Sequence, residues 1–342
     1  MPRERTFWLV LASLILVGVV ANLYHGLKDR GPEIVQLTLA PGAPVPVAQQ
    51  ASRRIFKEER FDPVAAVPAG EGQPLKLPTL LRADRRGDLY VLDSGDQRIR
   101  KISADGRLLL TYGAADLGNV MDAAVAPSGE VWVTEPDQTR ITVFSPTGAV
   151  ARRIRLEEAA VRLGLDADGG FVTTRFEGSE GLFHRYSAAA EPTGSFAALF
   201  PERLQNSLAL DGWIAPLGPD SFVYLFRNAG LLAAFTWQGR PLFFRRTLDP
   251  VPLPEVHIDP AIGQSVPRES PLASISGSVV GEDLWILSAT GDGRVLDVYD
   301  AESGSYRYSV EPPEKDARYV VMTTDRLFSA GRGGVTVWRR TG

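Results

Sequence analysis

Side chains whose oxygen atoms could coordinate a metal ion are the first candidates for chemistry in this sequence. Asn119 and Asp122 lie close together at the start of an apolar stretch. Amide and carboxylate oxygens are the ligands that Ca²⁺ prefers, because it is a hard cation that needs several of them. The pair is therefore a candidate metal site, of the kind a calcium-dependent hydrolase or lyase would use. The alternative for Asp122 is structural, since a carboxylate at the entry to a strand can accept hydrogen bonds from backbone amides.

Other catalytic groups are scarce. The 342 residues include three histidines, His25, His184 and His257, which are far apart, and no cysteine. This count argues against a histidine-rich metal centre and excludes disulfides and a cysteine nucleophile. The sequence has no Gly-x-Ser-x-Gly elbow and no glycine-rich phosphate loop with a lysine. Its net charge of -4 gives no basic face for nucleic acid. We therefore favour a non-catalytic protein without a cofactor over an enzyme.

Two acidic residues are followed five positions later by an arginine, as Asp93 and Arg98 and again as Glu135 and Arg140. Such pairs could bind a ligand. Their recurrence favours a different interpretation, in which each pair braces the loop between two strands through charge-assisted hydrogen bonds.

Both pairs belong to a longer motif that is written twice, from Gly87 to Gly106 and from Gly129 to Gly148. A repeat of this kind predicts a repeat fold. Further copies, each with short apolar strands ahead of a turn glycine, bring the number to six. Four strands in each of six repeats predict an all-β, six-bladed β-propeller over residues 53–342. We expect the innermost strands at residues 79–83, 122–126, 161–166, 213–217, 274–280 and 319–323.

The sixth repeat ends at Gly342, so its outermost strand must come from the N-terminal region. An open blade would otherwise leave an unpaired edge. Residues 33–39 and 53–61 both qualify. We favour 53–61, because it lies nearer the first inner strand and residues 31–52 resemble a proline-containing linker.

The residues from Asp93 to Ile99 and from Glu135 to Ile141 resemble the NHL-repeat family of propellers. The resemblance is specific in the first two repeats and architectural in the others. It implies the fold and a tendency to bind partners or ligands, without one activity. The calcium-dependent lactonases and the lyases among such propellers define the enzymatic alternative named above.

The N-terminus carries a targeting or spanning segment. Residues 7–20 are apolar, the run can be extended to Tyr24, and Arg3 and Arg5 precede it. The shorter length suits a signal peptide and the longer one approaches a membrane span. We favour an uncleaved helical anchor within residues 1–30 over cleavage near Ala21. The basic N-terminus would stay in the cytoplasm, which places the propeller on the extracytoplasmic side of a bacterial-type membrane.

A long insert interrupts the period between the fourth and fifth repeats. It covers residues 249–273 and contains six prolines together with Val256, His257 and Ile262. Long loops in compact domains are often functional. We expect this insert to share one face with the loops that contain Asp93, Glu135, Glu177 and Asp292. This face is the candidate binding surface for a protein partner, and the protein would then be an accessory subunit of a membrane complex. The alternative is a loop that only covers the mouth of the channel.

Overall fold

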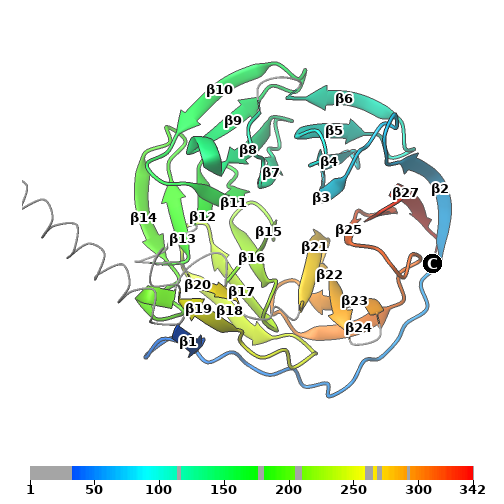
Figure 1. The fold of residues 1–342 in the computed structure, drawn as a ribbon. Helices are drawn as coiled ribbons and strands as arrows, with labels where there is room; N and C mark the ends of the chain where they lie inside the picture. The colour runs from blue at the N-terminus through cyan, green and yellow to red at the C-terminus, as the bar shows by residue number, and fades with distance from the viewer. Residues whose placement is uncertain are drawn as a thin grey trace, which may run out of the picture.

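Six four-stranded antiparallel sheets surround a central axis, as the blades of a β-propeller (Figure 1). The computed structural model describes residues 33–113, 117–175, 181–204, 210–258, 265–267, 272–290 and 293–341. The expected N-terminal helix lies outside these ranges. Among the residues within them, no helix is long and apolar enough to cross a membrane.

Blades 1 to 3 follow one another along the chain, each with its strands in order from the axis outward. Blade 1 consists of β3 (Pro78–Ala83), β4 (Leu89–Asp93), β5 (Arg98–Ile102) and β6 (Leu108–Tyr112); blade 2 of β7 (Asp122–Val125), β8 (Val131–Glu135), β9 (Arg140–Phe144) and β10 (Val150–Arg155); and blade 3 of β11 (Ala160–Leu165), β12 (Phe171–Arg175), β13 (Phe183–Tyr186) and β14 (Pro192–Phe196). Two short 3-10 helices, Pro136–Gln138 and Glu202–Leu204, lie in the connections.

Blades 4 to 6 complete the ring, and the last blade joins the two ends of the propeller. Blade 4 consists of β15 (Gly212–Pro216), β16 (Ser221–Phe226), β17 (Leu231–Thr236) and β18 (Pro241–Arg246); blade 5 of β21 (Ser274–Val280), β22 (Asp283–Thr290), β23 (Gly293–Asp300) and β24 (Tyr306–Val310); and blade 6 of β25 (Tyr319–Met322), β26 (Arg326–Gly331), β27 (Gly334–Arg340) and β2 (Phe61–Pro68). The six predicted inner strands are confirmed, each to within a residue or two at its ends.

The turn glycines of the motif explain why the repeat is so regular. Gly106 and Gly148 have φ angles of 82° and 91° and close the hairpins between the third and fourth strands of blades 1 and 2. This left-handed conformation favours glycine, because a side chain would be strained there.

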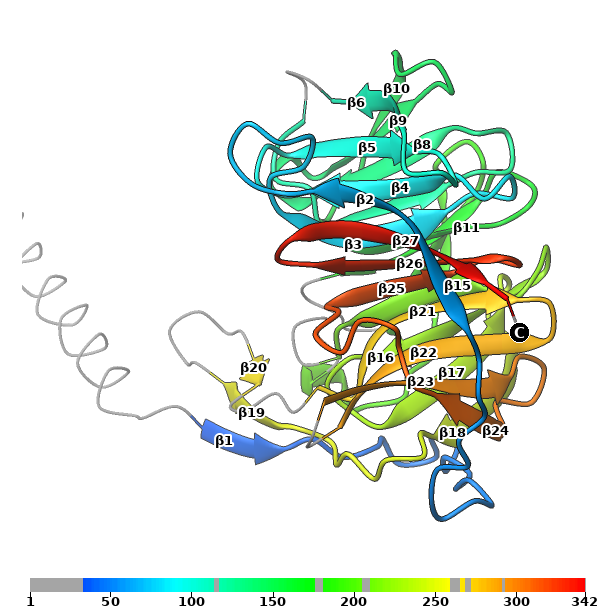
Figure 2. The ribbon, with the colours of Figure 1, turned by 90° about the vertical axis from the view of Figure 1, so that its right-hand side faces the viewer.

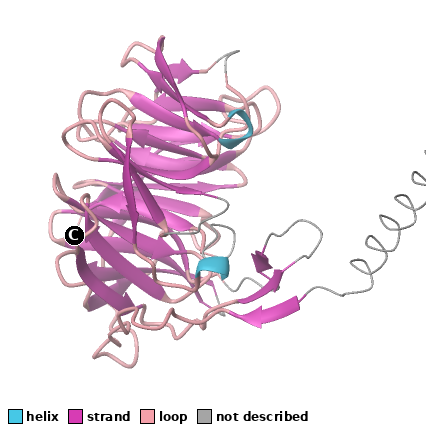
Figure 3. Ribbon diagram, turned by 90° about the vertical axis from the view of Figure 1, so that its left-hand side faces the viewer, coloured by secondary structure: helices cyan, strands magenta, loops and turns pink. Residues whose placement is uncertain are grey.

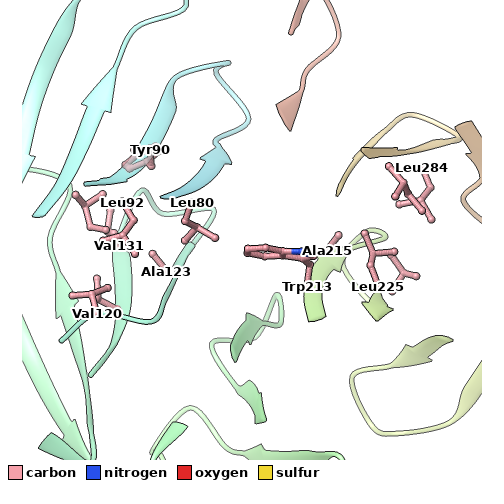
Figure 4. Packing of buried hydrophobic residues seen from close by; sticks show 14 of the residues in the cluster. Leu80, Tyr90, Leu92, Val120, Ala123, Val131, Trp213, Ala215, Leu225 and Leu284 are labelled. Atoms are coloured by element: carbon pink, nitrogen blue, oxygen red, sulfur yellow. The ribbon is translucent and has the colours of Figure 1, made fainter. Parts of the chain in front are cut away.

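The apolar core lies between the blades. Leu80 of blade 1 lies beside Ala123 and Val131 of blade 2, and Leu225 of blade 4 lies beside Leu284 of blade 5 (Figure 4). The second strands of blades 1 and 2 are buried throughout, which explains their continuous apolar sequence.

The strand that closes blade 6 is β2, and it pairs with β27 in the register Ala66 with Thr336. Our preference for residues 53–61 was therefore wrong except at Phe61. Residues 61–68 contain Pro63 and Pro68, which weaken a strand prediction but are tolerated in an edge strand. Residues 33–36 form a separate strand, β1 (Glu33–Gln36), outside the blades.

Candidate functional site

The insert contains two paired strands, whereas its prolines suggested a structureless loop. It contains β19 (Glu255–Ile258) and β20 (Ser265–Pro267), and β19 also pairs with β1. The order β1-β19-β20 makes a three-stranded antiparallel sheet, which we call the side sheet. Figures 2 and 3 show it beside the propeller, apart from the six blades. Residues 33–36 and the described strands of the insert thus belong to one sheet.

Packing against blade 4 holds the side sheet in place. Val256 of β19 and Leu37, just after β1, are fully buried in one cluster with Phe200, Phe226 and Leu231. Burying an aliphatic side chain of this size contributes about 1.5–3 kcal/mol. Val256 therefore faces the core, and our expectation that it is a surface contact for a partner does not agree with its burial.

The other predicted residues of the insert differ in their positions. His257 is half-buried, opposite Ile34 in the register of β1 and β19. Its Nε2 atom is buried and has no hydrogen-bond partner among the described residues. Ile262 lies outside the described residues, as do Glu177 and Asp292 of the loops predicted on the same face.

After β1 the chain continues along the outer edges of blades 4 and 5 before it enters blade 6 (Figure 2). We call residues 40–60 the strap. Val47 forms a parallel bridge with Arg245 of β18, and Phe56 forms one with Ser309 of β24. Between these two bridges the side-chain oxygen of Gln49 accepts a hydrogen bond of 2.7 Å from the amide of Tyr306. The segment that we expected to be a linker is therefore bonded to the propeller at several points.

Arg54 holds the strap to the propeller through ion pairs. Its guanidinium donates to Asp297 of β23 at 3.0 and 2.8 Å and to Asp249, at the start of the insert, at 2.9 Å. Burial alone would lower the pKa of Arg54, but the two carboxylates outweigh it, so the pKa is raised. The strap, the base of the insert and blade 5 thus meet at one partly buried cation.

Asp93 and Glu135 brace connections between blades. The Asp93 carboxylate accepts from the amides of Lys76 and Leu77, at 2.9 and 2.6 Å. Glu135 accepts from Arg140 at 2.8 Å and from the amide of Gly118 at 2.6 Å. Burial would raise the pKa of Glu135, but these hydrogen bonds lower it overall.

The bracing interpretation is confirmed for Glu135 and Arg140. It is wrong in detail for Asp93, whose nearest ion-pair partner is Arg100 at 3.7 Å, while Arg98 lies 3.7 Å from Asp96. Both acidic side chains are fully buried, which does not agree with our expectation that they face a partner.

Asp122 is also committed to the scaffold. Its carboxylate accepts from Arg82 at 2.9 Å and from the amides of Ala123 and Leu163 at 2.9 and 3.1 Å. The hydroxyl of Ser276 makes the corresponding contact between blades 5 and 6, accepting from the amide of Val320 at 2.9 Å. The structural interpretation of Asp122 is therefore confirmed.

The geometry gives the proposed calcium pair little support. Asn119 is exposed, while Asp122 is fully buried. In the part of the chain that the structure describes, no three histidine, cysteine, aspartate or glutamate side chains gather in a way that could hold a metal ion. The oxygens of Asp122 are instead neutralised by an arginine and two amides.

A tryptophan between two arginines lies near the axis, and we had not singled it out from the sequence. The Trp213 indole projects from β15 toward the middle of the ring (Figure 4). The guanidinium of Arg162 lies 4.6 Å from the ring centroid and that of Arg82 lies 5.7 Å from it. Tyr319 meets the indole edge-on at 6.0 Å. Because Trp213 is only 3% exposed, side chains fill the ring at this level.

Each of the two arginines is paired with a carboxylate, Arg162 with Asp211 and Arg82 with Asp122. Arg162 donates to both oxygens of Asp211 at 2.8 Å, and its pKa is raised because the carboxylates outweigh the effect of burial. The pKa of Arg82 is lowered, first by burial and then by the nearby Arg162, against the attraction of Asp122. This network couples the inner strands of blades 1 to 4.

The comparisons identify the fold and leave the family open. No family model matches the sequence, and no curated protein matches it. The resemblance to NHL repeats therefore stays a prediction. Many solved structures match this chain by fold, and the three described next have low sequence identity to it.

Three of these structures illustrate the range. A catalytically inactive virginiamycin B lyase variant from Staphylococcus aureus with quinupristin has a TM-score of 0.54 at 14% identity, over 83% of this chain and 100% of the lyase. A protein from Bacteroides fragilis that is described as exported has a TM-score of 0.56 at 10% identity, over 87% of this chain and 99% of that protein. A chain of the mitotic checkpoint complex has a TM-score of 0.55 at 11% identity, over 88% of this chain and 98% of that chain. Identities this low show the propeller fold alone and say nothing about activity.

Proposed function

We propose that this protein is a membrane-tethered, extracytoplasmic propeller that serves as a non-catalytic binding or assembly module. One observation carries the proposal: β1, the first described element after the apolar N-terminal segment, is part of the same sheet as the insert. The first described strand after the predicted anchor is therefore joined to the candidate binding element by backbone hydrogen bonds.

The length of the connection adds a distance limit. If the anchor ends at Tyr24, residues 25–32 can span at most about 28 Å when fully extended. The side sheet would then stay near the membrane surface, where it can reach the extracytoplasmic part of an integral membrane protein. Ile34 is 49% exposed on β1 and offers an apolar contact there. Some of the structural relatives belong to multiprotein assemblies, which is compatible with a binding role.

A pull-down of the full-length chain in mild detergent tests the proposal. We expect a membrane protein to co-purify with the wild type and to be lost with Ile34→Asp. The control is Val45→Asp, which places the same charge on a strap residue that is 80% exposed. Mass spectrometry of the purified chain would also show whether residues 1–21 are retained. The proposal would be contradicted if no membrane protein co-purified, or if the Ile34→Asp variant still bound the same membrane protein.

The rival function is a lyase, which the structural likeness to virginiamycin B lyase favours. In that lyase a histidine-to-alanine variant is catalytically inactive. The described histidines of this chain lie elsewhere than on the inner strands: His184 is in β13 and His257 is in the side sheet. Incubation with quinupristin followed by mass spectrometry separates the two functions. We expect no product, and turnover by the full chain would favour the lyase.

A further inference from the structure

The outer strand of each blade has an edge that no other blade strand covers. These strands are β6, β10, β14, β18, β24 and β2. An exposed edge presents unpaired backbone N–H and C=O groups and can pair with a strand from another protein. Proteins protect such edges with prolines, charges or a covering segment. The six edges of this propeller differ in that protection.

Five of the six edges are protected in a recognisable way. The strap covers part of β18 and β24 through its two parallel bridges. Pro192 is the first residue of β14, and β2 contains Pro63 and ends at Pro68. Three exposed arginines, Arg152, Arg153 and Arg155, occupy β10.

Among the residues that the structure describes, the edge of β6 has none of these three protections. Its sequence, Leu-Leu-Leu-Thr-Tyr, contains neither a proline nor a charge. Leu108 and Leu109 are 41% and 40% exposed, which is high for leucine in a strand. No described residue pairs with the outer side of β6, which ends its sheet.

The strap shows how an added segment bonds to such an edge. In blade 5 the amide of Ser309 donates to Ile55 and its carbonyl accepts from Lys57, both at 2.9 Å. In blade 4 the carbonyl of Phe244 accepts from Val47 at 2.9 Å. The outer strands β6, β18 and β24 each have a one-residue bulge near their start. Thr111 lies three residues after the start of β6, as Phe244 does in β18 and Ser309 in β24, so the three positions are equivalent. The N–H and C=O of Thr111 therefore point outward.

The surface beside β6 is basic. Arg152 stacks on Trp132 at 4.7 Å, and Trp132 packs on Phe171 of blade 3 at 5.6 Å. Because side chains alternate along a strand, Arg153 and Arg155 lie on the opposite face of β10, toward blade 1.

The two blades adjoin at this point. A Cβ placed at Gly148 of blade 2 would lie 3.4 Å from the Leu110 side chain of β6. Arg107, which precedes β6, is exposed as well. Of the described carboxylates in the adjoining turns, Asp105 and Glu157 are exposed and Glu158 is paired with Arg175 at 2.7 Å. The three exposed arginines, Arg107, Arg153 and Arg155, therefore leave a net positive charge among the described side chains beside the β6 edge.

We propose that β6 binds an extended, acidic segment of a partner protein as a fifth strand of blade 1. Backbone hydrogen bonds to Thr111 would supply the pairing, the exposed leucines would contact apolar residues, and Arg107 and Arg155 would attract carboxylates. A second copy of this chain fits less well, because pairing two β6 edges would bring two basic faces together. This surface is distinct from the side sheet, and its role goes beyond the function proposed above.

A peptide-binding experiment with the full-length chain in mild detergent tests this inference. The probe is a fluorescein-labelled peptide of about ten residues in which glutamate alternates with valine, long enough to span β6. Fluorescence anisotropy should show saturable binding that weakens as salt is added. Leu109→Glu should weaken it about tenfold, because it places a like charge beside the peptide. Hydrogen exchange at the Thr111 amide should slow when the peptide is bound.

Leu242→Glu is the matched control. Leu242 is the unpaired bulge residue of β18, as Leu109 is in β6, and it is 42% exposed. It should leave peptide affinity unchanged. Arg155→Glu provides a second, exposed test position, and a peptide with lysine in place of glutamate should not bind. Absence of binding, equal weakening by both leucine variants, equal binding of the lysine peptide, or unchanged exchange at Thr111 would each overturn the proposal.

Discussion

Arg54 and Asp297 form an ion pair, with 2.8 Å between Nη2 and Oδ2, that joins the strap to the third strand of blade 5. The Asp297 side chain is 1% exposed, and its other close partner is the hydroxyl of Ser309 at 2.6 Å. A carboxylate at this depth needs a cation, because its charge is removed from water. The strap therefore neutralises a charge that blade 5 buries.

Replacing Arg54 with methionine should destabilise the protein strongly. Removing one partner of a buried ion pair leaves the other charge uncompensated, which costs about 3–5 kcal/mol. Urea unfolding at neutral pH, followed by tryptophan fluorescence, measures the change in the free energy of unfolding. Arg53→Met is the control, because Arg53 is the exposed neighbour on the same strap. Equal stability of the two variants would show that Arg54 is dispensable.

Replacing Glu135 with glutamine should destabilise the protein in a pH-dependent manner. The folded state lowers the pKa of Glu135 below its ordinary value of 4.5, so the ionised form is the stabilising one. Its contribution is complete above the unfolded-state pKa and is lost as the pH falls through the folded-state pKa.

The difference in unfolding free energy between wild type and Glu135→Gln should therefore be about 1–3 kcal/mol at pH 7, and it should shrink below about pH 4. Urea unfolding of both proteins between pH 7 and pH 3 measures this difference. Glu130→Gln is the control, because Glu130 lies in the same hairpin and contacts Ser128, with no ion pair to an arginine among the described residues. A difference that stays constant with pH would contradict the role assigned to the carboxylate.

The repeat made the blades predictable. Each inner and second strand is a short apolar run ahead of a turn glycine, so one pattern located all six copies. The closing strand was harder to predict, because Pro63 and Pro68 made residues 61–68 a poor strand by composition, while their edge position allows both prolines.

The candidate site could be predicted only in part. The insert was visible as a break in the period, but its pairing with β1 was not, since the hydrogen bond from Gln36 to Leu253 joins residues 217 positions apart. Trp213 and Arg162 lie outside the repeated motif, and no local pattern indicates that they stack. Contacts of this kind depend on how the blades close and not on neighbouring residues.

Replacing Trp213 with alanine should open a cavity near the axis. Truncating a buried aromatic side chain costs about 3–5 kcal/mol, and here Arg82 and Arg162 also lose their aromatic partner. Trp213→Phe keeps an aromatic face between the arginines and should cost less. Thermal unfolding of the two variants measures the difference. If both variants melt at the same temperature, stacking with the arginines contributes nothing.

Replacing Val256 with alanine should loosen the side sheet and leave the blades intact. Val256 is fully buried against blade 4, so the smaller side chain removes part of the packing that holds β19 and β1 in place. Hydrogen exchange measured by mass spectrometry should become faster in peptides covering residues 33–40 and 253–258, and stay unchanged in those covering β4 and β8, because regions with less packing open locally. Val45→Ala, at a residue that is 80% exposed, should change neither group. Faster exchange throughout the blades would instead show that the side sheet and the propeller unfold as one unit.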